Sequence, residues 1–197
     1  MVNLQRRTIA ALLGVGMIAL GLSFPLATLV VNGGQAPEGL HLKGQVDMIL
    51  YNEAGKIKDE RHLDNLIVDA GLQGVASRIA PHDGTINPSA AYNYIALGTG
   101  GDTAVAASQT SLVNELPAGA NYGRLQDATA TYSAVSGKKL ILSVTFEPGK
   151  GTGTLSESGI FNAATSGDML ARQTFSPVQK AAGDTLTVTW TITLTPS

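Results

Sequence analysis

Residues 185–195 read TLTVTWTITLT, and this stretch decides the fold class. Apolar side chains occupy every second position, and threonine occupies all the others. A period of two is typical of a β-strand with one buried face and one exposed face. Burying each of these apolar side chains contributes about 1.5–3 kcal/mol before entropy is counted. The stretch is therefore expected to lie in the centre of a sheet, with Trp190 as its largest core residue.

Strands and turns are predicted along the rest of the chain. Residues 45–51 place Val46, Met48 and Leu50 on one face, and residues 56–63 return as the partner strand after a turn at 52–55. Apolar residues near helical spacing predict one short helix over 67–79. Further strands are predicted over residues 92–97, 124–132, 138–146, 154–162 and 169–175, and the second and third of these are expected to pair. The sequence thus predicts a mainly β fold, an antiparallel β-sandwich of seven or eight strands with one short helix.

Composition limits the function. A chain of 197 residues suits one domain with an appendage. Charged residues make up only 14% and the net charge is −2, so the chain lacks the excess of Lys and Arg that nucleic acid requires, and no nucleic-acid partner is expected. The absence of cysteine excludes disulfides, thiolate zinc sites and cysteine nucleophiles.

The N-terminal segment points to a membrane. Residues 8–31 carry no charge and only Pro25 interrupts them, which makes the run longer than the roughly 20 apolar residues that span a bilayer as a helix. Arg6 and Arg7 precede the run, and the next charge is Glu38. The positive-inside tendency keeps residues 1–7 cytoplasmic and places everything after residue 31 outside.

Two interpretations of this segment stay open. As a cleaved signal peptide, it has an apolar region at residues 9–21, with Gly21 and Ser23 at a suitable cleavage spacing. As an uncleaved anchor, it keeps residues 26–31 inside the bilayer. In both cases residues 1–31 are the export or anchor segment, 32–39 a glycine-rich linker, and 40–197 the β-sandwich domain. The expected location is the extracellular face of a membrane, a cell surface or a virion.

Residues with catalytic potential are sparse. His41, His62 and His82 have no spacing that suits a metal site or a catalytic triad, and no glycine-rich phosphate loop is present. We therefore predict no catalytic residue, no cofactor, no metal site and no enzyme activity. Glu157 and Arg172 become diagonal neighbours if a hairpin is centred on residues 165–166. A structural ion pair is the favoured role, because no second acid accompanies Glu157.

Four stretches together resemble a known module. They are NYIALGTG at residues 93–100, SGIFN at 158–162, LARQTF at 170–175 and GDTLTVTWTITL at 183–194. Their order resembles a β-sandwich module of tail and fibre proteins of tailed phages and of related archaeal viral or cell-surface proteins, and NLIVDAGL at residues 65–72 fits the same pattern. The resemblance covers roughly residues 44–195. It implies a structural role and identifies no binding site.

The leading functional hypothesis is a structural subunit whose partners are copies of itself, in a surface filament, a lattice or a virion. A strand donated to a neighbouring subunit would pair with an open sheet edge, with Leu26, Leu29, Val30 and Val31 as the self-assembly residues. The alternative is a membrane-anchored adhesin or receptor-binding module. Its loops at residues 81–91 and 147–153 would contact a host receptor or glycan.

Overall fold

The computed structural model describes residues 40–79, 90–119, 121–133 and 138–196. The chain divides into two units, Met1–Ala36 and Pro37–Ser197, and the described residues all belong to the second. The predicted membrane segment and linker at residues 1–39 therefore lie outside the described residues. Most of the loop predicted at residues 81–91 also lies outside them.

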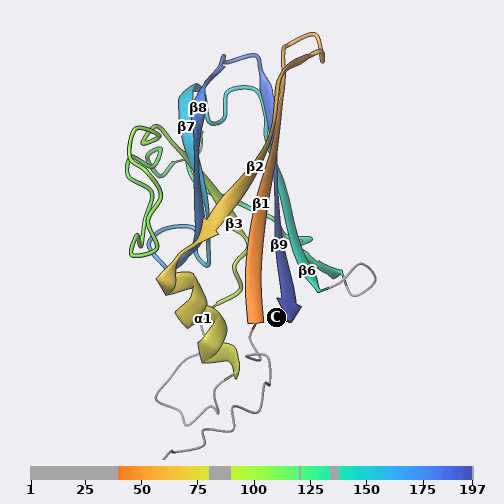
Figure 1. Cartoon of the computed structure of the whole chain (residues 1–197). Coiled ribbons are helices and arrows are strands. Elements are labelled where there is room, and N and C mark those ends of the chain that lie inside the picture. The colour runs from red at the N-terminus through yellow and green to blue at the C-terminus, as the bar shows by residue number, and fades with distance from the viewer. Residues whose placement is uncertain (1–39, 80–89, 120, 134–137, 197) are drawn as a thin grey trace, which may run out of the picture. The chain divides into compact units, whose positions relative to one another are not determined.

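The described residues form one antiparallel sheet of nine strands, in the order β4-β3-β7-β8-β2-β1-β9-β6-β5 (Figure 1). The strands are β1 Leu40–Tyr51, β2 Ile57–Ile67, β3 Tyr94–Gly98, β4 Leu125–Gln126, β5 Thr131–Ser133, β6 Lys139–Phe146, β7 Gly153–Phe161, β8 Met169–Lys180 and β9 Thr185–Pro196. The prediction of a mainly β, antiparallel fold with one short helix is confirmed. The strand number exceeds the predicted seven or eight because the region predicted as one strand over residues 124–132 contains two very short edge strands, β4 and β5.

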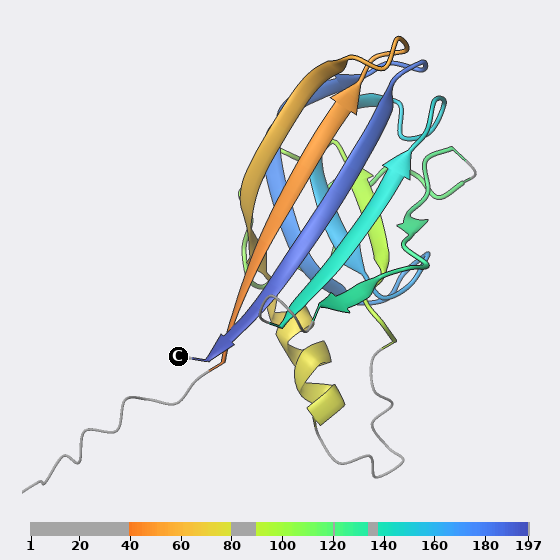
Figure 2. The same cartoon turned by 90° about the vertical axis from the view of Figure 1, so that its right-hand side faces the viewer.

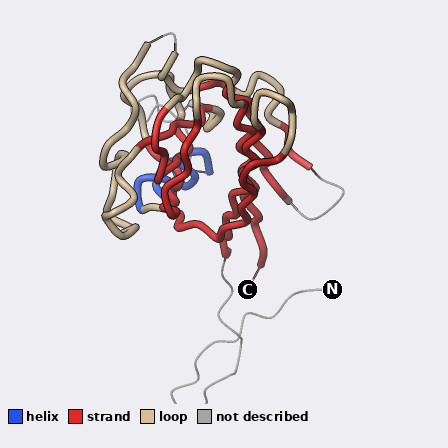
Figure 3. Tube along the Cα trace, turned by 90° about the horizontal axis from the view of Figure 1, so that it is seen from above, coloured by secondary structure: helices blue, strands red, loops and turns tan. Residues whose placement is uncertain are grey.

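Strand β2 joins the two halves of the sheet. Most of β2 pairs with β1, whereas its last two residues, Leu66 and Ile67, pair with β8. In Figure 2, β2, β1, β9 and β6 form the near layer, and β8, β7 and β3 lie behind them. Figure 3, seen from above, shows the strands arranged around a common interior. The sheet thus folds over at β2 and encloses the core between its two halves.

The core follows the predicted alternation along β1 and β9. Val46, Met48 and Leu50 of β1 are buried, and so are Leu186, Val188, Trp190 and Ile192 of β9. Strand β9 lies between β1 and β6, where Trp190 pairs with Val46 on one side and Leu142 on the other. Among the described residues, the buried main core extends from Val46 to Ile192. Residues 37–197 contain all of this described core, and we expect them to fold on their own.

Helix α1, Asp69–Ile79, packs against β8. It begins at Asp69 instead of the predicted Ile67, because Ile67 still pairs with β8 as the last residue of β2. Gly71 lowers the helix propensity of this stretch, but it also permits the packing. A Cβ atom at Gly71 would collide with the backbone of Leu170 on β8. The helix can therefore approach the sheet this closely only because glycine stands at that position.

The prediction of one strand over residues 124–132 is wrong. The stretch forms β4 and β5 at opposite edges of the sheet, and only β5 pairs with β6. Between them, the Asp127 carboxylate accepts hydrogen bonds from the backbone N–H groups of Thr129 and Ser143, at 2.8 and 2.7 Å. The Asp127 N–H donates to the Asn93 carbonyl at 2.8 Å. Since Asn93 precedes β3 and Ser143 lies on β6, Asp127 links the two edges of the sheet.

The connection between β3 and β4, residues 99–124, covers the outer face of β3, β7 and β8. Its Leu112 forms a second apolar cluster with Ala96 of β3, Phe161 of β7 and Met169 of β8. Strand β7 is consequently buried on both faces, and seven consecutive residues from Leu155 to its end are buried. This double burial explains why β7 lacks the alternation of apolar and polar residues seen in β9.

Candidate functional site

Glu157 on β7 and Arg172 on β8 form an ion pair beneath the connection. Nη2 of Arg172 lies 2.8 Å from Oε2 of Glu157, and both side chains are 0% exposed. Glu157 is opposite Thr174 and Arg172 is opposite Gly159, so the two charged residues are diagonal neighbours on adjacent strands. The structure therefore brings together the two residues that the sequence placed on one face of a hairpin.

The remaining hydrogen bonds of this pair hold the connection against the sheet. The carboxylate accepts the backbone N–H groups of Gly100, Val113 and Asn114, at 2.9, 3.1 and 2.7 Å. The Arg172 guanidinium donates to the Gly100 carbonyl at 2.9 Å and to Oε1 of Gln109 at 3.0 Å. Charges engaged in this way, and sealed from solvent, cannot reach a substrate while the connection is in place. The arrangement performs a structural task.

A second charged cluster holds the end of the same connection, and no pattern in the sequence predicted it. The Arg124 guanidinium lies 3.4 Å from the centre of the Phe161 ring. It forms an ion pair with Glu115 at 2.6 Å and donates to the carbonyls of Ala163 and Ser166 in the β7–β8 turn. These partners lie on separate segments of the chain. A search for local motifs cannot find such a cluster, because no fixed spacing defines it.

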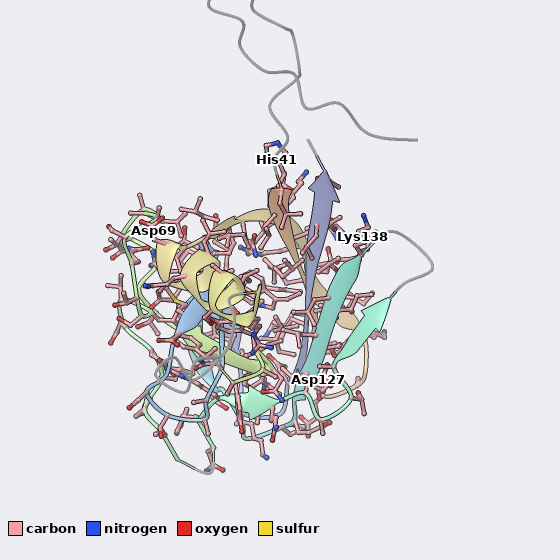
Figure 4. All side chains as sticks on the ribbon, turned by 90° about the horizontal axis from the view of Figure 1, so that it is seen from below. His41, Asp69, Asp127 and Lys138 are labelled. Atoms are coloured by element: carbon pink, nitrogen blue, oxygen red, sulfur yellow. The ribbon has the colours of Figure 1, made fainter. Side chains whose placement is uncertain are left out.

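An apolar pocket of about 370 Å³ lies at the end of the domain where β1 and β6 begin and β9 ends. Its walls are mainly aliphatic and include Leu42, Val75, Leu140, Leu170, Ile192 and Leu194. Figure 4 looks at this end, with α1 in front and with His41 on β1, Lys138 just before β6 and Asp127 labelled. The strand ends, the helix and the β4–β5 link thus all contribute to this end of the domain. We call this feature the end pocket.

Polar groups at the end pocket are engaged with the chain itself. Arg78 lies 5.9 Å from the centre of the Tyr92 ring and donates to the Ala90 carbonyl. Asp127, which also lines the pocket, makes the hydrogen bonds that link the sheet edges. Aliphatic walls with a few polar groups are typical of sites for apolar ligands or side chains. The described lining residues offer no matched acid and base for a proton transfer.

The two described histidines, His41 and His62, are not brought together. His41 is exposed on β1, and His82 lies outside the described residues. Nδ1 of His62 on β2 lies 2.6 Å from Oδ1 of Asp47 on β1. This hydrogen bond raises the pKa of His62, and the charges of Asp47 and Glu60 add to the effect. Over the residues that the structure describes, no three His, Asp or Glu side chains are grouped as a metal site would require.

A buried lysine closes the opposite end of the domain. Lys180 is 0% exposed, and burial lowers its pKa. Its Nζ donates to the carbonyls of Glu147 and Asp184. Nζ of Lys58 lies 2.6 Å from Oδ2 of Asp184, and this hydrogen bond lowers the pKa of the Asp184 carboxyl. The cluster ties β2 to the β6–β7 loop and to the β8–β9 turn.

Comparison with known proteins assigns neither a family nor a function to this chain. No family model, curated protein or solved structure matches this chain at a significant level. Within the described ranges, no helix is both long and apolar enough to cross a bilayer. The predicted self-assembly residues Leu26, Leu29, Val30 and Val31 lie outside those ranges. The resemblance to phage tail and fibre modules therefore stays a prediction.

Proposed function

We propose that this chain is a non-enzymatic structural subunit that is displayed outside a membrane and associates with copies of itself. The assembly is a surface filament, a lattice or a virion component. The folded part is a β-sandwich of the kind found in tail and fibre proteins of tailed phages and in related archaeal proteins. The two facing layers, β2-β1-β9-β6 and β8-β7-β3, support this description of the domain (Figure 2).

The observation that carries the proposal is the uncharged run 8–31 behind Arg6 and Arg7. The length of the run and the two arginines before it favour export of the residues that follow. This holds whether the run is cleaved as a signal peptide or kept as an anchor. An exported protein with this domain is expected to act at a surface. The use of Glu157 and Arg172 to hold the connection favours a scaffold over an enzyme.

The outer face of the β9 layer supports self-association. Hydroxyl groups pair across β6 and β9 on this face: Ser143 with Thr189 at 2.9 Å, and Thr145 with Thr187 at 3.2 Å. Such cross-strand hydroxyl pairs stabilise the sheet locally. On β6 and β9 they form a regular strip of short, uncharged side chains, next to the charged residues Lys43 and Asp47 of β1. Within this strip no long side chain needs to be ordered when a second copy packs on it.

The orientation can be tested with protease added outside intact cells or particles. Residues 32–197 are expected to be digested or shaved from the surface, while a tag on residues 1–7 survives, if the run is retained. The reason is the charge asymmetry around the run. Immunoblots against both ends give the measurement, and detergent-permeabilised samples are the control. Protection of the domain in intact samples, with digestion after permeabilisation, would contradict the proposed location.

Self-association can be tested on residues 24–197, which keep the apolar residues 26–31, and on residues 36–197, which lack them. We expect the longer protein to have a mass above that of a monomer, because an exposed apolar segment favours association. Light scattering over a wide concentration range and negative-stain microscopy give the measurement. Assembly of both proteins would indicate packing through the sheet faces. Monomers in both cases would contradict the structural-subunit proposal.

The adhesin alternative rests on the β6–β7 loop. Its residues 147–149 are exposed, and Gly149 and Gly151 fix it through backbone hydrogen bonds to Ala182 and Asn121. A fixed, exposed loop can present a contact surface. Binding of monomeric residues 36–197 to cells or glycans, without any assembly, would favour the adhesin over the structural subunit.

A further inference from the structure

The sheet edges leave little room for a donated strand. On the outer edge of β3, Tyr94 and Ile95 pair with β4, and Leu97 accepts a hydrogen bond from the N–H of Leu116. On the outer edge of β6, residues 139–141 pair with β5, and the Ser143 N–H donates to Asp127. Along these stretches of β3 and β6, an added strand would therefore have to displace existing pairs. Extension of the sheet at these positions is disfavoured.

The end pocket is the opening that suits an apolar segment. It is bounded by the first residues of β1 and β6, by the last residues of β9 and by α1. Its volume, about 370 Å³, suits a few aliphatic side chains and is too small for a whole strand. Strand β1 begins at Leu40, and Leu42 lines the pocket. The linker of each chain thus joins the domain beside the mouth of its own end pocket.

The chain contains a segment with matching chemistry. Residues 26–31, LATLVV, are uncharged, and every residue except Thr28 is apolar. The spacer 32–39 separates them from β1, and when extended it can reach on the order of 26–29 Å. The composition of the spacer, with its glycines and Pro37, disfavours a helix. Apolar side chains that enter aliphatic walls lose their contact with water, which stabilises the complex.

We propose that the end pocket receives aliphatic side chains of residues 26–31 from a second copy of this chain. The proposal rests on the proposed self-association and on cleavage of the export segment before residue 24, and it names the site of association. At Leu40 the backbone still lies in β1, paired with Pro196 of β9. Insertion within one chain would require the spacer to reverse the direction of β1, whereas insertion into a neighbour requires no reversal.

The position of the pocket also predicts the symmetry of the assembly. Because the linker joins the domain at the same end as the pocket, two copies that meet end to end can exchange segments reciprocally. Such an exchange is isologous and closes at two subunits. The assembly unit is therefore a two-fold dimer. A filament or lattice would be built from these dimers through other surfaces, such as the hydroxyl-rich face of β9.

A peptide titration tests the site directly. The probe is a peptide of residues 24–34, FPLATLVVNGG, added to residues 36–197 and followed by NMR and calorimetry. Saturable binding with one peptide per domain is expected, with the largest shift changes at Leu42, Leu140 and Ile192. A peptide with Leu29→Asp and Val31→Asp should bind at least about tenfold more weakly, because a buried unpaired charge is costly. The Asn32→Asp peptide is the matched control and should bind like the parent.

A variant of the domain provides the second arm. Ala130→Phe places a ring in the pocket and should abolish peptide binding, while Thr187→Phe, on the outer face of β9, should leave binding unchanged. Circular dichroism of both variants verifies that they fold. If Ala130→Phe unfolds the domain, Leu140→Gln replaces it and should weaken binding at least about tenfold by making the wall polar.

The outcomes separate this proposal from the broader one. Peptide binding at the end pocket, together with a dimer of residues 24–197 in light scattering, supports both. If residues 24–197 assemble but the peptide does not bind, the end pocket is not the site of association, although the self-association proposal is retained. The same conclusion follows if the NMR shift changes are centred on the β9 face. If the peptide binds but residues 24–197 remain monomeric in light scattering, the segment does not insert into a second copy. Monomers without peptide binding overturn both proposals.

Discussion

Arg172→Met is expected to lower the free energy of unfolding by about 3–5 kcal/mol, because it leaves the Glu157 carboxylate buried and without its cation. Most domains have a total stability of about 5–15 kcal/mol, so the loss is severe. Chemical denaturation followed by circular dichroism gives the measurement. Hydrogen exchange should show the local effect first, since the amides of Gly100, Val113 and Asn114 donate to Glu157.

Two matched variants show whether the buried charge is the cause. Arg61→Met breaks the ion pair with Asp59, which is partly exposed, and should cost about 1 kcal/mol or less. The double variant Glu157→Gln with Arg172→Met removes both charges, and its loss should be smaller than the sum of the two single losses. Equal effects of Arg172→Met and Arg61→Met would show that the buried pair has no special weight in this fold.

Trp190→Ala should also cost about 3–5 kcal/mol, because it removes the largest side chain of the core and leaves a cavity there. It also removes the indole N–H that donates to Oγ of Ser158 at 3.3 Å. Trp190 is the only tryptophan, so unfolding has to be followed by circular dichroism instead of fluorescence.

The neighbouring residue provides the control. Thr189 lies on the other face of β9, where its hydroxyl pairs with Ser143. Thr189→Ala should cost about 1 kcal/mol or less, since an exposed hydroxyl pair contributes little. Trp190→Phe should fall between the two alanine variants, because it keeps an aromatic ring in the core. Comparable losses for Trp190→Ala and Thr189→Ala would mean that the two faces of β9 are wrongly assigned.

The elements predicted best from the sequence are the strands with one buried face and one solvent-exposed face. Strand β9 and residues 45–51 of β1 alternate apolar and polar residues, so their burial could be predicted residue by residue. Strand β7 is covered on both faces, and periodicity cannot show what covers its outer side. Only the diagonal geometry of a hairpin indicated that Glu157 could face Arg172. The backbone groups that complete the cluster come from a connection without regular structure.

The errors arise where the chain changes direction without a glycine or proline signal. Residues 124–132 look like one strand, but Asp127 turns the chain from one sheet edge to the other. An aspartate that accepts the N–H two residues later forms a turn of its own, and the pair Asp127 and Thr129 was the available signal. The end pocket had no signal at all. Its walls come from strand ends and a helix that meet only in the folded chain.

The position of β9 between β1 and β6 has a consequence for the time course of folding. On that side, β6 cannot complete its pairs until residue 193 has been synthesised, and β1 cannot complete its pairs until residue 196 has been synthesised. At the usual speed of translation, β1 waits roughly 7–30 s after it emerges. Pairing between segments so distant in the chain is slow in itself. During this interval the nascent polypeptide cannot close its core, and this delay suits the proposed export, in which the chain would cross a membrane before it folds.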